Sequence, residues 1–205
     1  MSEDNYLNER RKALKESVAF FAPERKIERE TWIVDAFLRN LGFTFSPSEL
    51  MPEADEPPDI RFQGAQFELK ELLDPQRRRH KEYRDALTKA NAATDPAELL
   101  EPFTPRDATA DEIYARILDT VSGLLRKYPP ATCRDLDLLI YVNYEDVMGL
   151  IEEPFPDVTA LRDQPWRSVS FVLGQRACVL VARPDAPAFL TEAKGRIVHH
   201  TITSV

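Results

Sequence analysis

Asp59, Glu68 and Lys70 are the residues whose types and spacing could do chemistry. They lie in the stretch 59–70, DIRFQGAQFELK, in which polar and apolar side chains alternate. A turn at residues 63–64 makes this stretch a hairpin and places Asp59 opposite Glu68, with their Cβ atoms about 4.5–5.5 Å apart. Two carboxylates this close repel each other unless a cation lies between them, and Mg²⁺ is commonly held by one or two carboxylates. Lys70, on the same face, could activate a water or stabilise charge on a phosphate. The stretch therefore predicts a phosphodiesterase site that uses Mg²⁺ or Mn²⁺.

The hairpin prediction rests on a complete separation of side chains between two faces. One face is apolar and the other is polar, as expected for a hairpin that buries one side. The apolar face holds Ile60, Phe62, Ala65, Phe67 and Leu69, and the polar face holds Asp59, Arg61, Gln66, Glu68 and Lys70.

Helices and further strands are predicted before and after this hairpin in the sequence. Thr109 and Glu112 form a capping box, which predicts the start of a helix. Apolar spacing predicts helices over 5–21, 25–41, 75–91 and 109–127, and strands over 43–45, 136–142, 168–173, 176–182 and 196–202. A short helix is expected after Pro187, and residues 144–166 have no clear pattern. We expect the 59–70 hairpin at the centre of a mixed sheet, and the 168–182 hairpin either extending that sheet or contacting a second copy in a homodimer.

The site residues resemble a known motif. Pro58-Asp59, eight intervening residues and Glu68-Leu69-Lys70 resemble the motif of the PD-(D/E)XK nuclease superfamily, and the element order over 25–142 resembles the common core of that superfamily. Within the superfamily, the chain resembles a bacterial family of proteins labelled as endonucleases, domain of unknown function 1780. Other Pro-Asp and Glu-x-Lys pairs occur in the chain, but only this copy lies on a predicted hairpin that collects all three groups on one face.

The resemblance implies a fold, a reaction and roles for the three residues. The fold is α/β with a restriction endonuclease-like core of helix, three strands, helix and strand, an N-terminal helix and a C-terminal β-hairpin extension. We expect one domain over 1–205, with the core at 25–142 and the extension at 143–205 packed on it. The implied reaction is Mg²⁺-dependent hydrolysis of DNA, with Asp59 and Glu68 as metal ligands and Lys70 as the catalytic lysine.

A carboxylate on the helix ahead of the strands is a further candidate for the site. Members of the superfamily often add such a Glu, and the choices here are Glu28 and Glu30. The residues three, four, seven and eight positions after Glu30 are apolar, so Glu30 lies on the core-facing side of the helix, at its N-terminal end. We therefore choose Glu30. An ordinary first-turn carboxylate that favours the helix dipole is an equally good interpretation.

A basic segment follows the hairpin and predicts contacts with the DNA backbone. Residues 75–90 carry six Lys and Arg against two acids, whereas the whole chain carries −8. Such a run is equally often a solvated face, but it must leave from the end of the strand that carries Lys70. The candidate phosphate-binding residues are Arg77, Arg78, Lys81 and Arg84.

Composition excludes several other classes of protein. The 205 residues contain 43% hydrophobic residues, enough for a buried core, and only six Gly, with no glycine-rich phosphate loop. The two cysteines show no metal-site spacing, and no apolar run could span a bilayer or serve as a signal peptide, so we expect a cytoplasmic protein with no membrane partner.

Two alternatives to a nuclease stay open at this point. The first is a nuclease-like fold without catalytic activity that binds nucleic acid or protein, which the negative net charge favours. The second is a surface ion cluster, since exposed charged residues often pair without a function.

Overall fold

The structure of the protein is a computed structural model that describes residues 3–200. Contacts divide the chain into two compact units. One is helical and consists of the chain up to Arg29 together with Asp74–Thr104, and the other is built on sheets and consists of Glu30–Leu73 together with the chain from Pro105 onward. The single domain expected over 1–205 stays a prediction.

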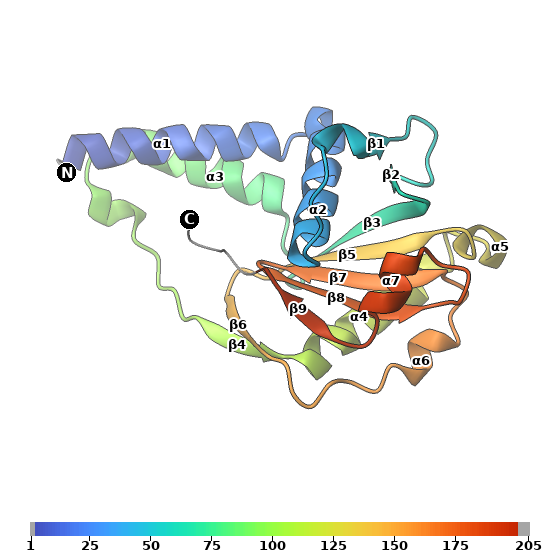
Figure 1. The fold of residues 1–205 in the computed structure, drawn as a ribbon. Helices are drawn as coiled ribbons and strands as arrows, with labels where there is room; N and C mark the ends of the chain where they lie inside the picture. The colour runs from blue at the N-terminus through green and yellow to red at the C-terminus, as the bar shows by residue number, and fades with distance from the viewer. Residues whose placement is uncertain (1–2, 201–205) are drawn as a thin grey trace. The chain divides into compact units, whose positions relative to one another are not determined.

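Two long helices form the helical unit. They are α1 (Glu3–Phe20) and α3 (Arg79–Ala92), which lie side by side (Figure 1). The Arg11 guanidinium donates to the carbonyl oxygens of Ala90 (2.9 Å) and Ala93 (2.8 Å), which satisfies acceptors at the end of α3. The rings of Phe21 and Tyr83 stack with centroids 5.1 Å apart. The unit also contains two 3-10 turns, η1 (Pro23–Arg25) and η3 (Pro96–Leu99).

A seven-stranded mixed sheet is the centre of the second unit, with strand order β1-β2-β3-β5-β7-β8-β9. β3, β5 and β7 run parallel to one another, and the other neighbours are antiparallel. The strands are β1 (Met51–Pro52), β2 (Ile60–Phe62), β3 (Ala65–Leu73), β5 (Asp137–Asn143), β7 (Ser168–Leu173), β8 (Arg176–Ala182) and β9 (Ile197–His199). A separate parallel pair is formed by β4 (Arg106–Thr109) and β6 (Val147–Ile151).

Helices cover both faces of this sheet. α4 (Ala110–Leu124) packs on one face, and its start is capped by the Thr109 hydroxyl, which accepts from the Glu112 N–H at 3.1 Å. α2 (Lys26–Asn40) and α7 (Ala188–Ala193) pack on the other face (Figure 1). Alternation along β5 serves both layers, because Leu138 packs towards α4 and Leu139 towards α2. The remaining short elements are η2 (Pro47–Glu49), α5 (Pro130–Cys133) and α6 (Thr159–Arg162).

The α/β class, the mixed sheet and most elements agree with the sequence. The hairpin has the predicted register, with Ile60 opposite Phe67, Arg61 opposite Gln66 and Phe62 opposite Ala65. The second hairpin, β7–β8, extends the sheet beside β5. Of the last predicted strand, residues 197–199 form β9, and the end at 201–202 lies outside the described residues. No helix within 3–200 combines the length and the apolar character needed to cross a bilayer.

Two expectations about the sheet are wrong. Phe43 and Phe45 do not form a strand, although both rings pack on Phe62. The Phe43 N–H donates to the Leu38 carbonyl oxygen at the end of α2, and Met51–Pro52 takes the place beside β2. The β2–β3 hairpin lies towards one edge of the sheet, since the C-terminal strands add three members on the far side of β5.

Candidate metal centre

β3 carries Glu68 and Lys70 on the face of the sheet that α4 covers. Glu68 pairs in register with Leu138 and Lys70 with Ile140, and both of these β5 residues belong to the α4 side of the core. Glu68 is buried, whereas the Lys70 side chain keeps 24% of its surface exposed. A carboxylate is thus placed inside the protein with a cation that can still reach solvent.

The two oxygens of Glu68 have different surroundings. Oε1 accepts hydrogen bonds from the Tyr128 hydroxyl and from the Lys70 ammonium, whose Nζ is 2.5 Å away. Oε2 is buried and has no hydrogen-bond partner. Lys70 Nζ also donates to the Leu69 carbonyl oxygen at 2.8 Å. The lysine therefore uses two of its three donors inside the protein, and one remains.

Asp59 lies where the antiparallel pairing of β2 and β3 ends. Its backbone N–H donates to the Phe67 carbonyl oxygen at 2.9 Å, and Phe67 is already the partner of Ile60. Its carboxylate Oδ2 accepts from the Leu69 N–H at 2.7 Å. The expected pairing of Asp59 with Glu68 is therefore wrong, because the ladder stops one residue earlier and a side chain takes the place of the next main-chain acceptor.

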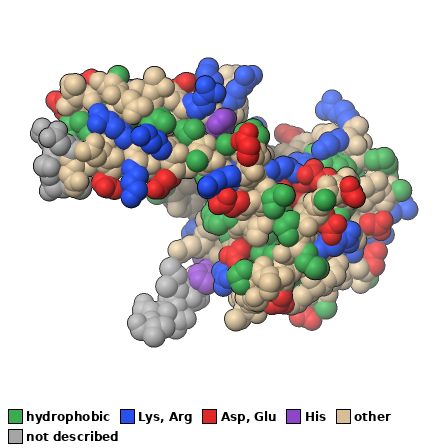
Figure 2. Space-filling model, turned by 90° about the horizontal axis from the view of Figure 1, so that it is seen from above, with side chains coloured by type: hydrophobic (Ala, Val, Ile, Leu, Met, Phe, Trp, Pro, Cys, Tyr) green, Lys and Arg blue, Asp and Glu red, His purple; other side chains and the backbone are tan. Residues whose placement is uncertain are grey.

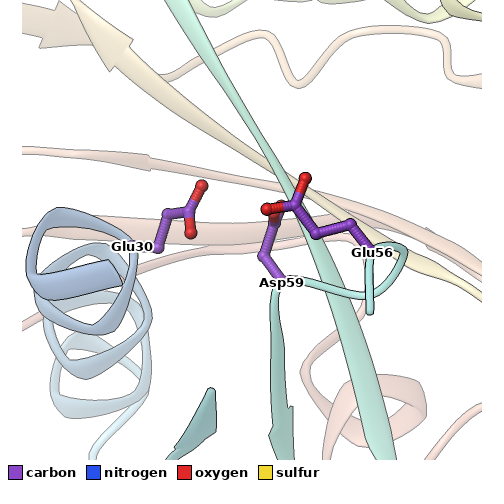
Figure 3. A group of neighbouring side chains, drawn as sticks. All are labelled: Glu30, Glu56 and Asp59. Atoms are coloured by element: carbon purple, nitrogen blue, oxygen red, sulfur yellow. The ribbon is translucent and has the colours of Figure 1, made fainter. Parts of the chain in front are cut away.

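Asp59 is grouped with two other carboxylates. Oxygens of Glu30, Glu56 and Asp59 all lie within 4.8 Å of one another. In Figure 3 the Glu30 side chain reaches from α2 towards Asp59, and Glu56 approaches from the loop that precedes β2. Glu30 is the helix carboxylate chosen from the sequence, whereas Glu28 forms an ion pair with Arg25 (3.4 Å). Glu68 does not belong to this group of three.

Glu56 is the residue that sequence reasoning missed. It is one of four acids in the Pro-rich stretch 46–58, which has no apolar pattern to show which side chain turns inward. The only available signal was its position three residues ahead of Asp59. Loop conformation, rather than periodicity, brings it to the site.

The donor set suits a hard divalent cation. Carboxylate oxygens are the ligands that Mg²⁺ and Mn²⁺ prefer, and a buried carboxylate oxygen without a partner is costly unless a cation or a donor meets it. The Asp59 carboxylate accepts from the N–H of Leu69, the residue that follows Glu68, so Glu68 lies close to the group around Asp59.

The four predicted phosphate-binding residues differ in their surroundings. Arg77 precedes α3 and is not part of it, and its guanidinium pairs with Asp74 (3.6 Å) and Glu82 (2.8 Å). The helix predicted over 75–91 begins only at Arg79, so the expectation that places Arg77 on that helix is wrong. Exposed side chains are those of Arg78, Lys81 and Arg84.

A shallow hollow on α3 includes some of these cations. It is lined by side chains of both signs, among them Arg78, Lys81 and Lys89 with Glu82 and Glu101. Figure 2 shows Lys and Arg side chains along the helical unit with Asp and Glu between them. The face is therefore mixed in charge rather than uniformly basic.

Comparison with known proteins assigns the chain to a family. Residues 2–204 match the family model described as "Putative endonuclease, protein of unknown function (DUF1780)". The chain belongs to this family. The resemblance to domain of unknown function 1780 is thus confirmed, and membership of the PD-(D/E)XK superfamily stays a prediction.

A solved structure is similar over almost the whole chain. It is a protein of unknown function from Pseudomonas aeruginosa strain PAO1, described as belonging to the monooxygenase superfamily. Sequence identity is 28%, the TM-score is 0.67, and the match covers 97% of this chain and 96% of the other. No curated protein matches the chain.

Proposed function

We propose that the protein is an endonuclease that hydrolyses DNA phosphodiester bonds with Mg²⁺ or Mn²⁺, on a restriction endonuclease-like core. The description of its family supports the reaction. Apart from α3 and β4, which are inserted between β3 and α4, and the short α5, the element order is α2, β1, β2, β3, α4, β5. This order supports the core, since the motif resemblance implies a helix, three strands, a helix and a strand.

One observation carries the proposal, namely the assembly of carboxylates around Asp59. Three carboxylates converge from a helix, a loop and the residue just ahead of β2. Asp59 binds the N–H of the residue after Glu68, and Glu68 has one buried oxygen without a hydrogen-bond partner. Within residues 3–200, the base that Glu68 holds is Lys70, which binds Oε1 and leaves Oε2 open to a cation.

Each residue of the site has a definite task in this reaction. Glu30, Glu56, Asp59 and the free oxygen of Glu68 would hold the cation, which when bound polarises a phosphate and lowers the pKa of a water. Lys70 would donate its remaining N–H to the attacking water or to a phosphate oxygen, which stabilises the charge that develops there. Its partial exposure permits this contact.

The test is Mn²⁺ binding and DNA cleavage by the purified protein and by Asp59→Asn. Asparagine can still accept the Leu69 hydrogen bond through its amide oxygen but carries no charge, so the local fold is kept. We expect wild type to bind Mn²⁺ in a calorimetric titration and to cleave supercoiled plasmid or a single-stranded oligonucleotide, and the variant to do neither. Wild-type protein that neither binds Mn²⁺ nor cleaves DNA would contradict the proposal.

A second candidate is a nuclease-like fold that binds nucleic acid or protein without cutting it. The ion pair between Lys70 and Glu68 favours it, because that lysine is already bound to a carboxylate. DNA binding that persists in EDTA, without cleavage at any Mg²⁺ or Mn²⁺ concentration, would identify this candidate.

A further inference from the structure

Tyr128 is buried beside the candidate metal centre and held there independently of its hydroxyl. It follows α4, and its backbone N–H donates to the Leu124 carbonyl oxygen at 2.9 Å. Its ring packs edge-on against the buried Trp166, with centroids 5.8 Å apart. Aromatic packing of this kind fixes the ring plane. The hydroxyl therefore has a defined position that does not depend on the bond it makes.

The Tyr128 hydroxyl acts as a hydrogen-bond donor to Glu68. A phenol has one proton to donate. Tyr128 donates this one hydrogen bond to Oε1 of Glu68.

The bond from Tyr128 decides which oxygen of Glu68 stays free. Together with Lys70 it supplies two donors to Oε1, which fills the two lone pairs of that oxygen. Oε2 receives none and is buried. Leaving a buried acceptor unpaired is costly, and more so for a charged group, so the arrangement is favourable only if a further group meets Oε2.

We propose that Tyr128 is a positioning residue for the metal centre. By holding Oε1, it turns Oε2 of Glu68 towards the divalent cation that Asp59 binds. The inference rests on the proposed function, because it requires that the carboxylates bind a cation. It adds a residue that lies 60 positions beyond Glu68 in the sequence and outside the motif.

The test compares Tyr128→Phe with wild type by Mn²⁺ titration of the purified full chain. Phenylalanine keeps the ring on Trp166 and removes only the hydroxyl. Loss of a partner that orients a metal ligand typically weakens metal affinity about 10–100-fold, and we expect a loss in this range. The thermal midpoint of the metal-free protein is measured in parallel. A merely structural role would shift that midpoint and leave the Mn²⁺ affinity unchanged.

Two further variants identify the route by which Tyr128 acts. Tyr114→Phe is the matched control, since Tyr114 is a partly buried tyrosine of α4 that packs on the same core cluster, and its Mn²⁺ affinity should equal that of wild type. In a Glu68→Gln background, Tyr128→Phe should change the affinity by less than about twofold, because its effect passes through Glu68.

The outcomes separate this inference from the proposed function. Wild-type protein that binds no Mn²⁺ overturns both. Wild-type protein that binds Mn²⁺, with Tyr128→Phe binding it equally well, overturns the positioning role alone. Equal losses from Tyr128→Phe with and without Glu68→Gln would also overturn it, since the tyrosine would then act by another route.

Discussion

Glu56 brings a third carboxylate to Asp59 from a loop, and its contribution can be measured by itself. Cation affinity depends on the number of charged ligands, so Glu56→Gln should weaken Mn²⁺ binding at least about tenfold. Asp55→Asn is the matched control, because it removes the same charge from the neighbouring position without touching the group. Calorimetric titration measures both, and equal affinities for the two variants would remove Glu56 from the site.

Lys70 is expected to affect the rate of hydrolysis rather than the affinity for the cation. Lys70→Met keeps the aliphatic stem and removes the donors, and a positioned proton-transferring or charge-stabilising group typically contributes about 10²–10⁴-fold. We expect a rate loss in that range with Mn²⁺ affinity close to wild type. The cleavage rate of labelled DNA at saturating Mn²⁺ measures it.

Lys127→Met is the control for this experiment. Lys127 is exposed, and its Nζ lies 4.7 Å from the centroid of the Tyr128 ring, so its removal also takes one positive charge from the neighbourhood of the site. It forms no hydrogen bond with Glu68, whereas Lys70 does. A similar loss in both variants would show that net charge, and not the position of Lys70, sets the rate.

At the scale of single elements, α3 is expected to bind the DNA backbone through its exposed cations. Arg78→Glu with Lys81→Glu should weaken binding and reduce the salt dependence, because each lost phosphate contact lowers the slope of log K against log salt by about 0.7–0.9. The control is Arg134→Glu with Arg162→Glu, two cations of the other unit. Fluorescence anisotropy at several salt concentrations measures DNA binding by both double variants. Equal slopes of log K against log salt for the two variants would show that α3 has no role in binding.

The basic segment also shows what its sequence did not reveal. A run of cations at 77–84 predicts a charged face, but charge counts say nothing about which cations find acids within the fold. Arg77 does, through Asp74 and Glu82, and the buried Arg79 lies over the Phe21 ring at 3.6 Å. The helix boundary explains this, since Arg77 lies ahead of α3 and Arg79 is its first residue, so neither lies along the exposed side of the helix.

The hairpin was predictable because burial of one face imposes a period of two on the sequence. That period set the register of β2 and β3 to the residue. The alternation could not show that the pairing of β2 with β3 ends at Ile60, since residues outside a sheet need not alternate between polar and apolar. Asp59 therefore occupies a different place from the one predicted, and the grouping with Glu56 followed from loop geometry that carries no pattern.

Phe43 and Phe45 show the limit of short apolar runs. Two aromatic residues on one side of an extended segment predict a strand, and both residues do pack on the core. A strand also needs a partner for its backbone, and here Met51–Pro52 pairs with β2 instead. The sequence thus indicated the contacts of these rings correctly and the hydrogen bonding wrongly.

At the scale of the whole molecule, buried cysteine thiols and tyrosine hydroxyls affect how stability depends on pH in the alkaline range. Burial, with a smaller effect from the Glu152 charge, raises the pKa of Cys178 from 9.0 to about 12. The pKa values of Cys133, Tyr114 and Tyr128 are also raised, with burial as the largest cause. In each case the folded protein keeps a proton that the unfolded chain releases at lower pH.

These four groups should therefore leave the free energy of unfolding unchanged below about pH 9 and lower it as the pH rises from 9 towards 12. Each such group adds a slope of about 1.4 kcal/mol per pH unit within its window. Cys178→Ala removes one of these slopes, and urea unfolding at pH 8, 9.5 and 11 measures the difference. If the free energies of unfolding of wild type and Cys178→Ala differ by the same amount at all three pH values, the assignment to Cys178 is refuted.

The two units carry very different net charges. Residues 1–29 and 74–104 hold 13 Lys and Arg against 12 Asp and Glu, or +1, and the rest of the chain holds 14 against 23, or −9. A polyanion is repelled by the second unit as a whole and not by the first. This distribution is the electrostatic reason to seek DNA contacts on α3.

The helical unit is assembled from two separate stretches of chain, and this constrains how such a protein can change by recombination. α1 precedes the sheet, whereas α3 is inserted between β3 and β4. Deleting either stretch alone leaves the other helix without its contacts. Phe21 would lose the ring of Tyr83, and the carbonyl oxygens of Ala90 and Ala93 would lose the Arg11 guanidinium. Gene fragments that exchange this unit must therefore carry both stretches at once, and single crossovers within the reading frame should yield insoluble products.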